Sequence, residues 1–268
     1  MGAAVQRSTR MLGRIGRTMQ ETSLVTDKAE VVLRECSSLT DFESCMELQR
    51  RVWQYGDLDI TPSAILVVVV KSGGHVIGAF DGDAMVGFVL GFAAFHGNER
   101  YIHSHMTVVS PSYHNHGIGK RLKLRQREIC RAQGIQRVVW TFDPLELKNA
   151  FFNIVRLGVM VREALPNVYG VTTSHLHGRL PTDRLVAEWR IDTPRVERIL
   201  AGEFPVLHSA GSVTVPADIG RMRSEDPLTA RREQERILKE FEHWFSKGYM
   251  VSGFERDGDN ARYLMEVA

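Results

Sequence analysis

The amino-acid sequence predicts an α/β protein whose mixed antiparallel and parallel sheet is flanked by helices and followed by a further α/β segment. Two apolar stretches, His75 to Phe80 and Met85 to Phe92, are joined by Asp81-Gly82-Asp83, which is typical of an antiparallel hairpin. Residues 101–142 then have the pattern strand, helix, strand, an order that makes the two strands parallel. Together these features predict a sheet of mixed type.

Composition and charge limit the classes of partner. The chain has 268 residues, 43% of them hydrophobic and 25% charged, and a formal net charge of +2, so neither nucleic acid nor an anionic membrane is expected as a partner. The longest apolar run, Ala64 to Val70, is much shorter than the roughly 20 residues of a membrane-spanning helix. A homodimer is compatible with this composition.

The three cysteines, Cys36, Cys45 and Cys130, have neither CxxC nor metal-type spacing. This pattern fits a reducing cytoplasm better than a disulfide-linked fold, and all three are expected to be small buried hydrophobic residues. Residues 1–28 are rich in arginine and are not followed by an apolar segment, so we expect a disordered basic tail or an over-extended start.

Residues 29–193 are expected to form the main domain. A short strand at Val31 to Leu33 precedes a helix that begins with the capping-box pattern Thr40 to Glu43 and runs to about Trp53. Residues 64–71 fit a helix after Pro62 or a strand equally well. The hairpin follows, and then a third strand at Tyr101 to Val109.

A helix is predicted from Gly117 to Gln133, with most of its basic residues, Lys123 among them, away from the apolar face. A strand at Gln136 to Phe142 follows, then a helix around Asn149 to Leu157, and Leu185 to Ile191 is expected to complete the sheet.

The segment 194–268 is predicted to be an α/β extension that packs on the main domain. Asp226-Pro227 is typical of a helix start, and the apolar stripe after it ends at Gly248. The stretches Tyr249 to Glu255 and Ala261 to Glu266 are joined by Asp257-Gly258 and predict a hairpin.

The loop from Val109 to Gly119 is the strongest candidate for a ligand site. Its sequence, VSPSYHNHGIG, joins a strand to a helix, and its glycines fall where the helix begins. Glycine lets the backbone approach a ligand closely, and the first amides of a helix lack partners and lie at the positive end of its dipole. A diphosphate is therefore the expected ligand. The chain has neither the Gly-Lys-Ser/Thr of a Walker loop nor the G-x-G-x-x-G fingerprint of a Rossmann fold.

This loop resembles motif A of the GNAT superfamily of acyl-CoA N-acyltransferases, V-x-P-x-x-[RQ]-x-x-G-x-G, with His114 in place of the usual Arg or Gln. The resemblance covers residues 31–192 and is most specific over 101–158, while the tail resembles that of a bacterial subgroup with an extended C-terminus. It implies a GNAT-type sheet and acetyl-CoA or another acyl-CoA as co-substrate. The cofactor-binding residues it implies are Val108, Val109, His114, Asn115, His116, Gly117, Ile118, Gly119, Lys120 and Asn149.

Acyl transfer to an amine requires a base, and His103 and His105 share one face of the strand that enters the loop. Many GNAT enzymes carry a glutamate base at the place of His103. Either histidine suits proton abstraction near neutral pH, and the alternative is that both are structural members of a half-buried strand. Ile154 occupies the place of the family's usual tyrosine acid, which leaves Tyr169, Tyr113 or water to protonate the thiolate.

Two further roles follow from polar residues near these positions. Asp143 is a candidate for contacting the acceptor, with helix capping as the alternative for both Asp143 and Asn149. The pairs His103/His105, His114/His116 and His175/His177 allow a zinc site, but the second pair lies inside the expected diphosphate turn, so no metal is predicted.

These patterns together predict an N-acyltransferase that moves an acyl group, acetyl by default, from acyl-CoA to a primary amine of a small metabolite. One alternative is a succinyl-CoA-type enzyme that acts on an amino acid. The other is a catalytically silent acyl-CoA-binding module, which the missing tyrosine would suit.

Overall fold

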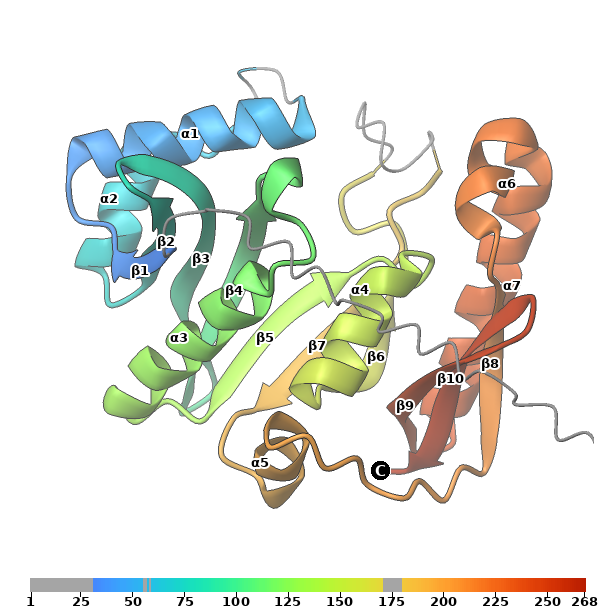
Figure 1. Cartoon of the computed structure of the whole chain (residues 1–268). Coiled ribbons are helices and arrows are strands. Elements are labelled where there is room, and N and C mark those ends of the chain that lie inside the picture. Colours follow the sequence, from blue (N-terminus) through green and yellow to red (C-terminus); the bar gives the residue numbers. More distant parts are fainter. Residues whose placement is uncertain (1–30, 55–56, 58, 171–179) are drawn as a thin grey trace, which may run out of the picture.

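The computed structural model of the protein describes residues 31–54, 57, 59–170 and 180–268 (Figure 1). The predicted basic tail, residues 1–28, lies outside the described residues. One sheet of ten strands runs through the described part, in the order β1-β2-β3-β4-β5-β7-β6-β9-β10-β8. Among these strands β4 and β5 pair in parallel, and the other neighbours pair antiparallel.

The strands are β1 (Val32–Glu35), β2 (His75–Asp81), β3 (Ala84–His96), β4 (Glu99–Val109), β5 (Arg137–Phe142), β6 (Met160–Leu165), β7 (Arg184–Arg190), β8 (Gly211–Pro216), β9 (Tyr249–Asp257) and β10 (Asn260–Val267). The α-helices are α1 (Leu39–Trp53), α2 (Ser63–Lys71), α3 (Ile118–Ala132), α4 (Leu147–Phe151), α5 (Pro194–Leu200), α6 (Ile219–Glu225) and α7 (Pro227–Ser246). A 3₁₀ turn, η1 (Pro111–Tyr113), and a π-helical turn, η2 (Phe152–Arg156), complete the described elements.

Helices cover both faces of the first four strands. On β2, Val76 packs in the apolar cluster under α1 and α2, while its neighbour Ile77 packs in the cluster under α3. The alternation of strand side chains therefore separates two apolar layers. The ambiguous segment 64–71 is the helix α2, whose valines pack on the sheet.

The predicted capping box lies two residues earlier in the structure. Ser38 is the N-cap of α1 and accepts from the Asp41 amide at 3.1 Å, while an Asp41 carboxylate oxygen accepts from the Ser38 amide at 3.2 Å. The prediction of Thr40 as the cap was wrong because Ser38 and Asp41 satisfy the same spacing one half-turn upstream.

The parallel pair β4 and β5 separates early. Pairing is confined to Ile102 with Val138 and His103 with Val139, although β4 continues to Val109 and β5 to Phe142. A β-bulge also interrupts β4, because Leu90 of β3 faces Met106 and Gly91 faces Ser104, which leaves His105 as the extra residue. The two strands therefore diverge beyond His103 and open a gap toward the end of β4 (Figure 1).

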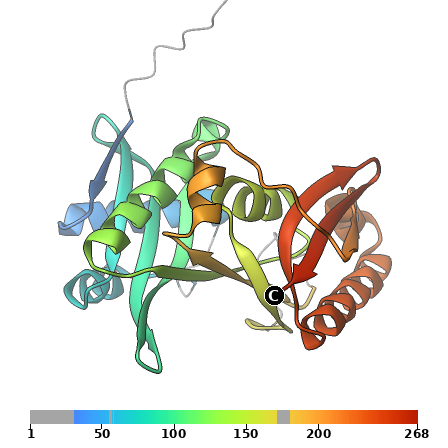
Figure 2. The same ribbon diagram turned by 90° about the horizontal axis from the view of Figure 1, so that it is seen from below.

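The predicted strand at residues 185–191 is β7, but it does not complete the sheet. It lies between β5 and β6, and the sheet continues through the single residue pair Val161–Val251 into β9, β10 and β8 (Figures 1 and 2). The helix and hairpin predicted in the C-terminal segment are α7 and the pair β9–β10. One apolar cluster joins the two parts, and it includes Trp189, Phe241 and Tyr263.

The three cysteines are buried and free, as predicted. Among the described helices, none combines the length and apolar character needed to cross a membrane.

Candidate active site

The glycine loop takes the conformation that its sequence predicts. Gly117 is the N-cap of α3 with φ +74°, and Asn115 also has a positive φ of +64°. The Arg121 amide makes the first backbone hydrogen bond of the helix, to the Gly117 carbonyl at 3.0 Å. Within the described part of the chain the amides of residues 115–120 have no acceptor, and a Cβ built on Gly117 would meet nothing within 4 Å. The loop thus offers free donors and open space, which fits a diphosphate.

The side chains of the loop mostly hold its shape. His114 Nε2 lies 3.0 Å from the Val109 carbonyl oxygen, and His116 Nδ1 lies 2.8 Å from the His114 carbonyl oxygen. Tyr113 hydrogen-bonds Asp81 at the end of β2. The side chain of Ile118, the first residue of α3, is buried between this helix and the sheet. Contact with a ligand at Ile118 is therefore restricted to its backbone, and the Tyr113 hydroxyl is engaged away from the diverging strands.

His103 and His105 lie on the face of β4 opposite α3, with ring centroids 6.2 Å apart. His105 also meets the Phe92 ring edge-on at 5.5 Å, and Phe92 belongs to the layer of α1 and α2. His103 is half-buried and stands beside Val139 at the last pair before the strands diverge. The structure therefore brings the two candidate bases together at the start of the gap.

Burial favours the neutral form of both histidines. Burial lowers the pKa of His103, and the nearby His105 and Lys123 lower it further. Burial also lowers the pKa of His105. Because both shifts disfavour the imidazolium, each side chain is in the form that a general base needs near pH 7.

Tyr169 is brought to the same region from the segment after β6. Its hydroxyl lies 3.3 Å from the Thr141 hydroxyl on β5, beyond the point where β4 and β5 separate. The side chain is partly exposed, and the Arg184 guanidinium lies 5.4 Å from its ring centroid. Ile154, at the place of the family's usual acid, is buried in the π-helical turn η2 and offers no proton.

Asp143 follows β5, and Asn149 lies in the first turn of α4. The Asp143 side chain is buried, accepts from the Leu145 amide at 2.8 Å and pairs with Arg223 of α6 at 2.6 Å. Both carboxylate oxygens thus hold the segment after β5. Asn149 is exposed in the first turn of α4, where Glu146 is the N-cap, so Asn149 does not cap the helix.

A buried polar network on the α3 face was missed by sequence reasoning. Lys123 was expected on the polar side of its helix, but its Nζ is buried, donates to Ser104 Oγ at 2.7 Å and Gln126 Oε1 at 3.1 Å, and lies 3.8 Å from the Trp140 ring centroid. Burial lowers the pKa of Lys123 to about 7. Gln126 in turn meets His75 at 2.8 Å.

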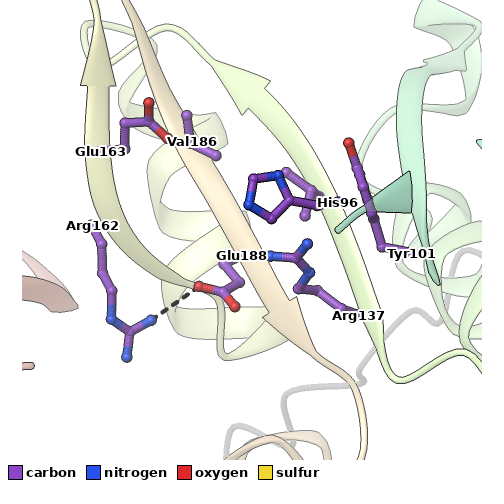
Figure 3. A pocket seen from close by; sticks show the side chains of 8 residues that line it. His96, Tyr101, Arg137, Arg162, Glu163, Val186 and Glu188 are labelled. Atoms are coloured by element: carbon purple, nitrogen blue, oxygen red, sulfur yellow. Dashed lines mark hydrogen bonds and ion pairs between the residues drawn. The ribbon is translucent and has the colours of Figure 1, made fainter. Parts of the chain in front are cut away.

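A cavity of about 280 Å³ is lined by residues of β3, β4, β5, β6 and β7 (Figure 3). It adjoins His103 through Val139, the register partner of His103. Its walls carry both signs of charge. The lining residues are His96, Tyr101, Arg137, Val139, Arg162, Glu163, Val186 and Glu188.

An ion-pair chain runs along one side of this cavity. Arg137 pairs with Glu99 at 3.2 Å, and Arg162 pairs with Glu188 at 3.1 Å. Arg190 connects the two carboxylates, at 2.9 Å from Glu99 and 2.6 Å from Glu188. Three guanidinium groups thus share two carboxylates, which leaves an excess of hydrogen-bond donors beside the cavity.

Within the described residues, no group of three or more His, Cys, Asp or Glu side chains is placed to hold a metal ion. His175 and His177 lie outside the described residues.

Comparison with known proteins identifies the domain that contains this site. Residues 40–152, which include all but the first residue of α1, the loop, α3 and α4, match the model of the Acetyltransferase (GNAT) family. This segment is a GNAT acetyltransferase domain. The matched segment contains both candidate bases and the glycine loop, and it ends before β6, β7 and the C-terminal extension. Among curated proteins, no relative matches the chain.

Solved GNAT structures resemble part of the chain. The ribosomal-protein-S18-alanine N-acetyltransferase of Escherichia coli is 13% identical, with 61% of this chain and 96% of that chain covered and a TM-score of 0.48. An aminoglycoside 6'-acetyltransferase type Ii is 21% identical over 60% and 98% of the two chains, with a TM-score of 0.47. The YncA acetyltransferase of Salmonella typhimurium, solved with acetyl-CoA, is 14% identical over 60% and 94%, with a TM-score of 0.49.

Proposed function

We propose that this GNAT protein transfers an acyl group, acetyl by default, from acyl-CoA to the primary amine of a small molecule. The observation that carries the proposal is the placement of the glycine loop at the end of β4, where β4 and β5 diverge beside His103 and His105. The open space at Gly117 and the free amides of residues 115–120 support a diphosphate at this turn. Lys120 adds a positive charge next to it.

The co-substrate supplies an activated thioester, and the chain supplies position and proton transfer. His103 or His105, both neutral, accepts the proton that the amine loses as its nitrogen bonds the acyl carbon. The carbon–sulfur bond breaks, and the Tyr169 hydroxyl gives its proton to the departing thiolate and recovers one from solvent. Its contact with Thr141 beyond the strand separation supports this assignment, because Ile154 leaves the usual donor position apolar.

Thiol release with acetyl-CoA and succinyl-CoA, measured against a panel of primary amines and amino acids, tests the proposal. We expect acceptor-dependent release with at least one amine. Tight coenzyme A binding without release for any acceptor would identify the silent module instead, and absence of coenzyme A binding would contradict the assigned loop.

The cavity favours a finer candidate, an acceptor that carries a carboxylate beside its amine. Arg137 is held against the Tyr101 ring at 4.8 Å and is largely buried, and its Nε has no hydrogen-bond partner within the described residues. Arg137 and Val139 are two residues apart on one strand face, a span of roughly 7 Å. An amino acid with its carboxylate on Arg137 would place its amine near His103. A cavity of about 280 Å³ is at the low end for small-molecule sites, which suits a ligand of this size.

Matched acceptors test this finer proposal. Each amino acid is compared with its amide and with its decarboxylated amine, and we expect turnover of the carboxylate form to be at least about 10-fold better. Arg137→Met should remove that preference without changing coenzyme A affinity, whereas Arg190→Gln, which breaks the same ion-pair chain outside the cavity, should keep it. Equal turnover of all three forms would exclude the carboxylate contact and leave acyl transfer itself intact.

A further inference from the structure

Tyr169 is tied to the C-terminal helix α7 by a continuous series of hydrogen bonds. Gln234 of α7 is buried, and its Nε2 donates to the Pro181 carbonyl at 2.7 Å and to Asp183 Oδ2 at 2.8 Å. The other carboxylate oxygen of Asp183 accepts from the Asn167 amide at 2.9 Å. Gln234 therefore holds the residues that lead into β7. Through Asp183 it also holds the turn that follows β6.

The same turn holds the tyrosine directly. The Asn167 side-chain oxygen accepts from the Thr182 amide at 3.2 Å, and Thr182 Oγ1 accepts from the Tyr169 amide at 2.8 Å. Thr182 also donates to the Gly170 carbonyl at 2.9 Å, and the Val168 amide donates to the Thr182 carbonyl at 3.0 Å. Both sides of Tyr169 are thus bonded to one residue, Thr182, which is itself buried.

This arrangement leaves the phenol with little freedom. The backbone of residue 169 is held from Thr182, while its hydroxyl reaches Thr141 on β5 at 3.3 Å. A proton donor that is misplaced by about 1 Å loses much of its effect, so the rigidity of this turn bears on the rate. The GNAT family match ends at residue 152, and apart from Thr141 the residues that form these bonds lie beyond it.

We propose that Gln234 is a positioning residue for Tyr169, so that the C-terminal extension completes the active site by setting the proton donor. The proposal rests on the acyl transfer proposed above. Its chemistry is one proton transfer: the Tyr169 O–H bond breaks, the thiolate sulfur gains the proton, and the phenolate is reprotonated by water. Gln234 touches no reacting atom and acts through Asp183 and the turn at residues 167–170.

A double-mutant cycle tests the connection. Tyr169→Phe should lower kcat by about 10²-fold with unchanged coenzyme A affinity, and Gln234→Leu should lower kcat by about 10-fold. If Gln234 acts through the phenol, the double variant turns over at the rate of Tyr169→Phe alone. Arg231→Gln, on the exposed side of the same helix, is the matched control and should leave the rate unchanged. A full additional loss from Gln234→Leu in the Tyr169→Phe background would overturn the proposal.

Amide hydrogen exchange provides a readout that needs no turnover. Gln234→Leu should speed exchange at the amides of Asn167 and Tyr169, which Asp183 and Thr182 protect, whereas Arg231→Gln should not. Unchanged exchange at both amides would contradict the connection even in an active enzyme. If Gln234→Leu speeds exchange at these amides but the wild-type protein acylates no amine, the hydrogen-bond series is upheld, and its catalytic role is rejected together with the proposed function.

Discussion

The two faces of the strand pair β4–β5 carry polar groups in opposite situations. On the α3 face, Lys123 and Ser104 form hydrogen bonds in a buried setting between a helix and two strands. On the other face, His103 lies beside Val139, which lines a cavity, and His105 lies next to His103. Both sets of groups are pushed toward neutrality by burial, but one has no access to a substrate. A shifted pKa therefore marks burial first, and a catalytic role only where the group also meets open space.

The largest effect should come from the open face. Replacing both histidines, His103→Ala with His105→Ala, should lower the acyl-transfer rate by at least about 10²-fold while coenzyme A affinity and the free energy of unfolding change little. The single variants identify which ring is the base. A stable double variant with near wild-type turnover would show that neither histidine is the base. The reaction would then use an acceptor amine that is already deprotonated.

Substitution on the α3 face should change the free energy of unfolding more than the rate. Lys123→Met removes a buried amine whose pKa is about 7, far below its value in an unfolded chain, and fills a similar volume. Removing this amine raises the free energy of unfolding. The increase is partly offset by the hydrogen bonds that Ser104 and Gln126 lose, each worth about 1 kcal/mol. We expect a net increase of about 2 kcal/mol in the free energy of unfolding at pH 7, measured by denaturant titration. A decrease would show that the network stabilises the fold.

The pH dependence of stability sharpens the same point. Because the pKa of Lys123 is lowered on folding, the unfolded chain binds one more proton between about pH 7 and its unfolded value of 10.5. Wild-type stability should therefore rise with pH across this window, and Lys123→Met should not share that rise. The advantage of the variant should shrink by pH 9. Parallel curves for the two proteins would mean that Lys123 titrates normally.

The smallest of these effects concerns the glycine loop that joins β4 to α3. Gly117→Val puts a β-branched residue at φ +74°, which costs about 1–3 kcal/mol and fills the open space over the turn. Coenzyme A affinity by calorimetry should fall by about 10-fold or more, and Gly97→Val, at a positive φ in the distant β3–β4 turn, is the control for strain alone. Equal affinity in wild type and Gly117→Val would mean that the diphosphate lies elsewhere.

Sequence reasoning reached the elements with strong local signals. The hairpin at Asp81-Gly82-Asp83 and the strand–helix–strand unit with its parallel pair were predicted and are confirmed. Two strands, β6 (Met160–Leu165) and β8 (Gly211–Pro216), were not predicted. Each is short, and its pairing in the sheet defines it more than the pattern of its own residues does.

The candidate site divides in the same way. The glycine loop and the histidine pair follow from spacing along one strand, and the structure brings them together. The burial of Lys123, the Arg223–Asp143 pair and the reach of Gln234 to Asp183 depend on contacts between residues far apart in the sequence. No local pattern specifies such partners, so the roles of the C-terminal extension became visible in the fold alone.

The single residue pair between β6 and β9 also determines where the sheet is able to grow. Without the extension, β6 would end the sheet as an exposed edge, and such edges recruit strands from other molecules. With β9 beside it, the outermost strands are β1, of four residues, and β8, of six residues with Pro216 at its end. Short edges, one of them closed by a proline that lacks an amide donor, are poor templates for pairing, so the extension protects this protein against edge-to-edge aggregation.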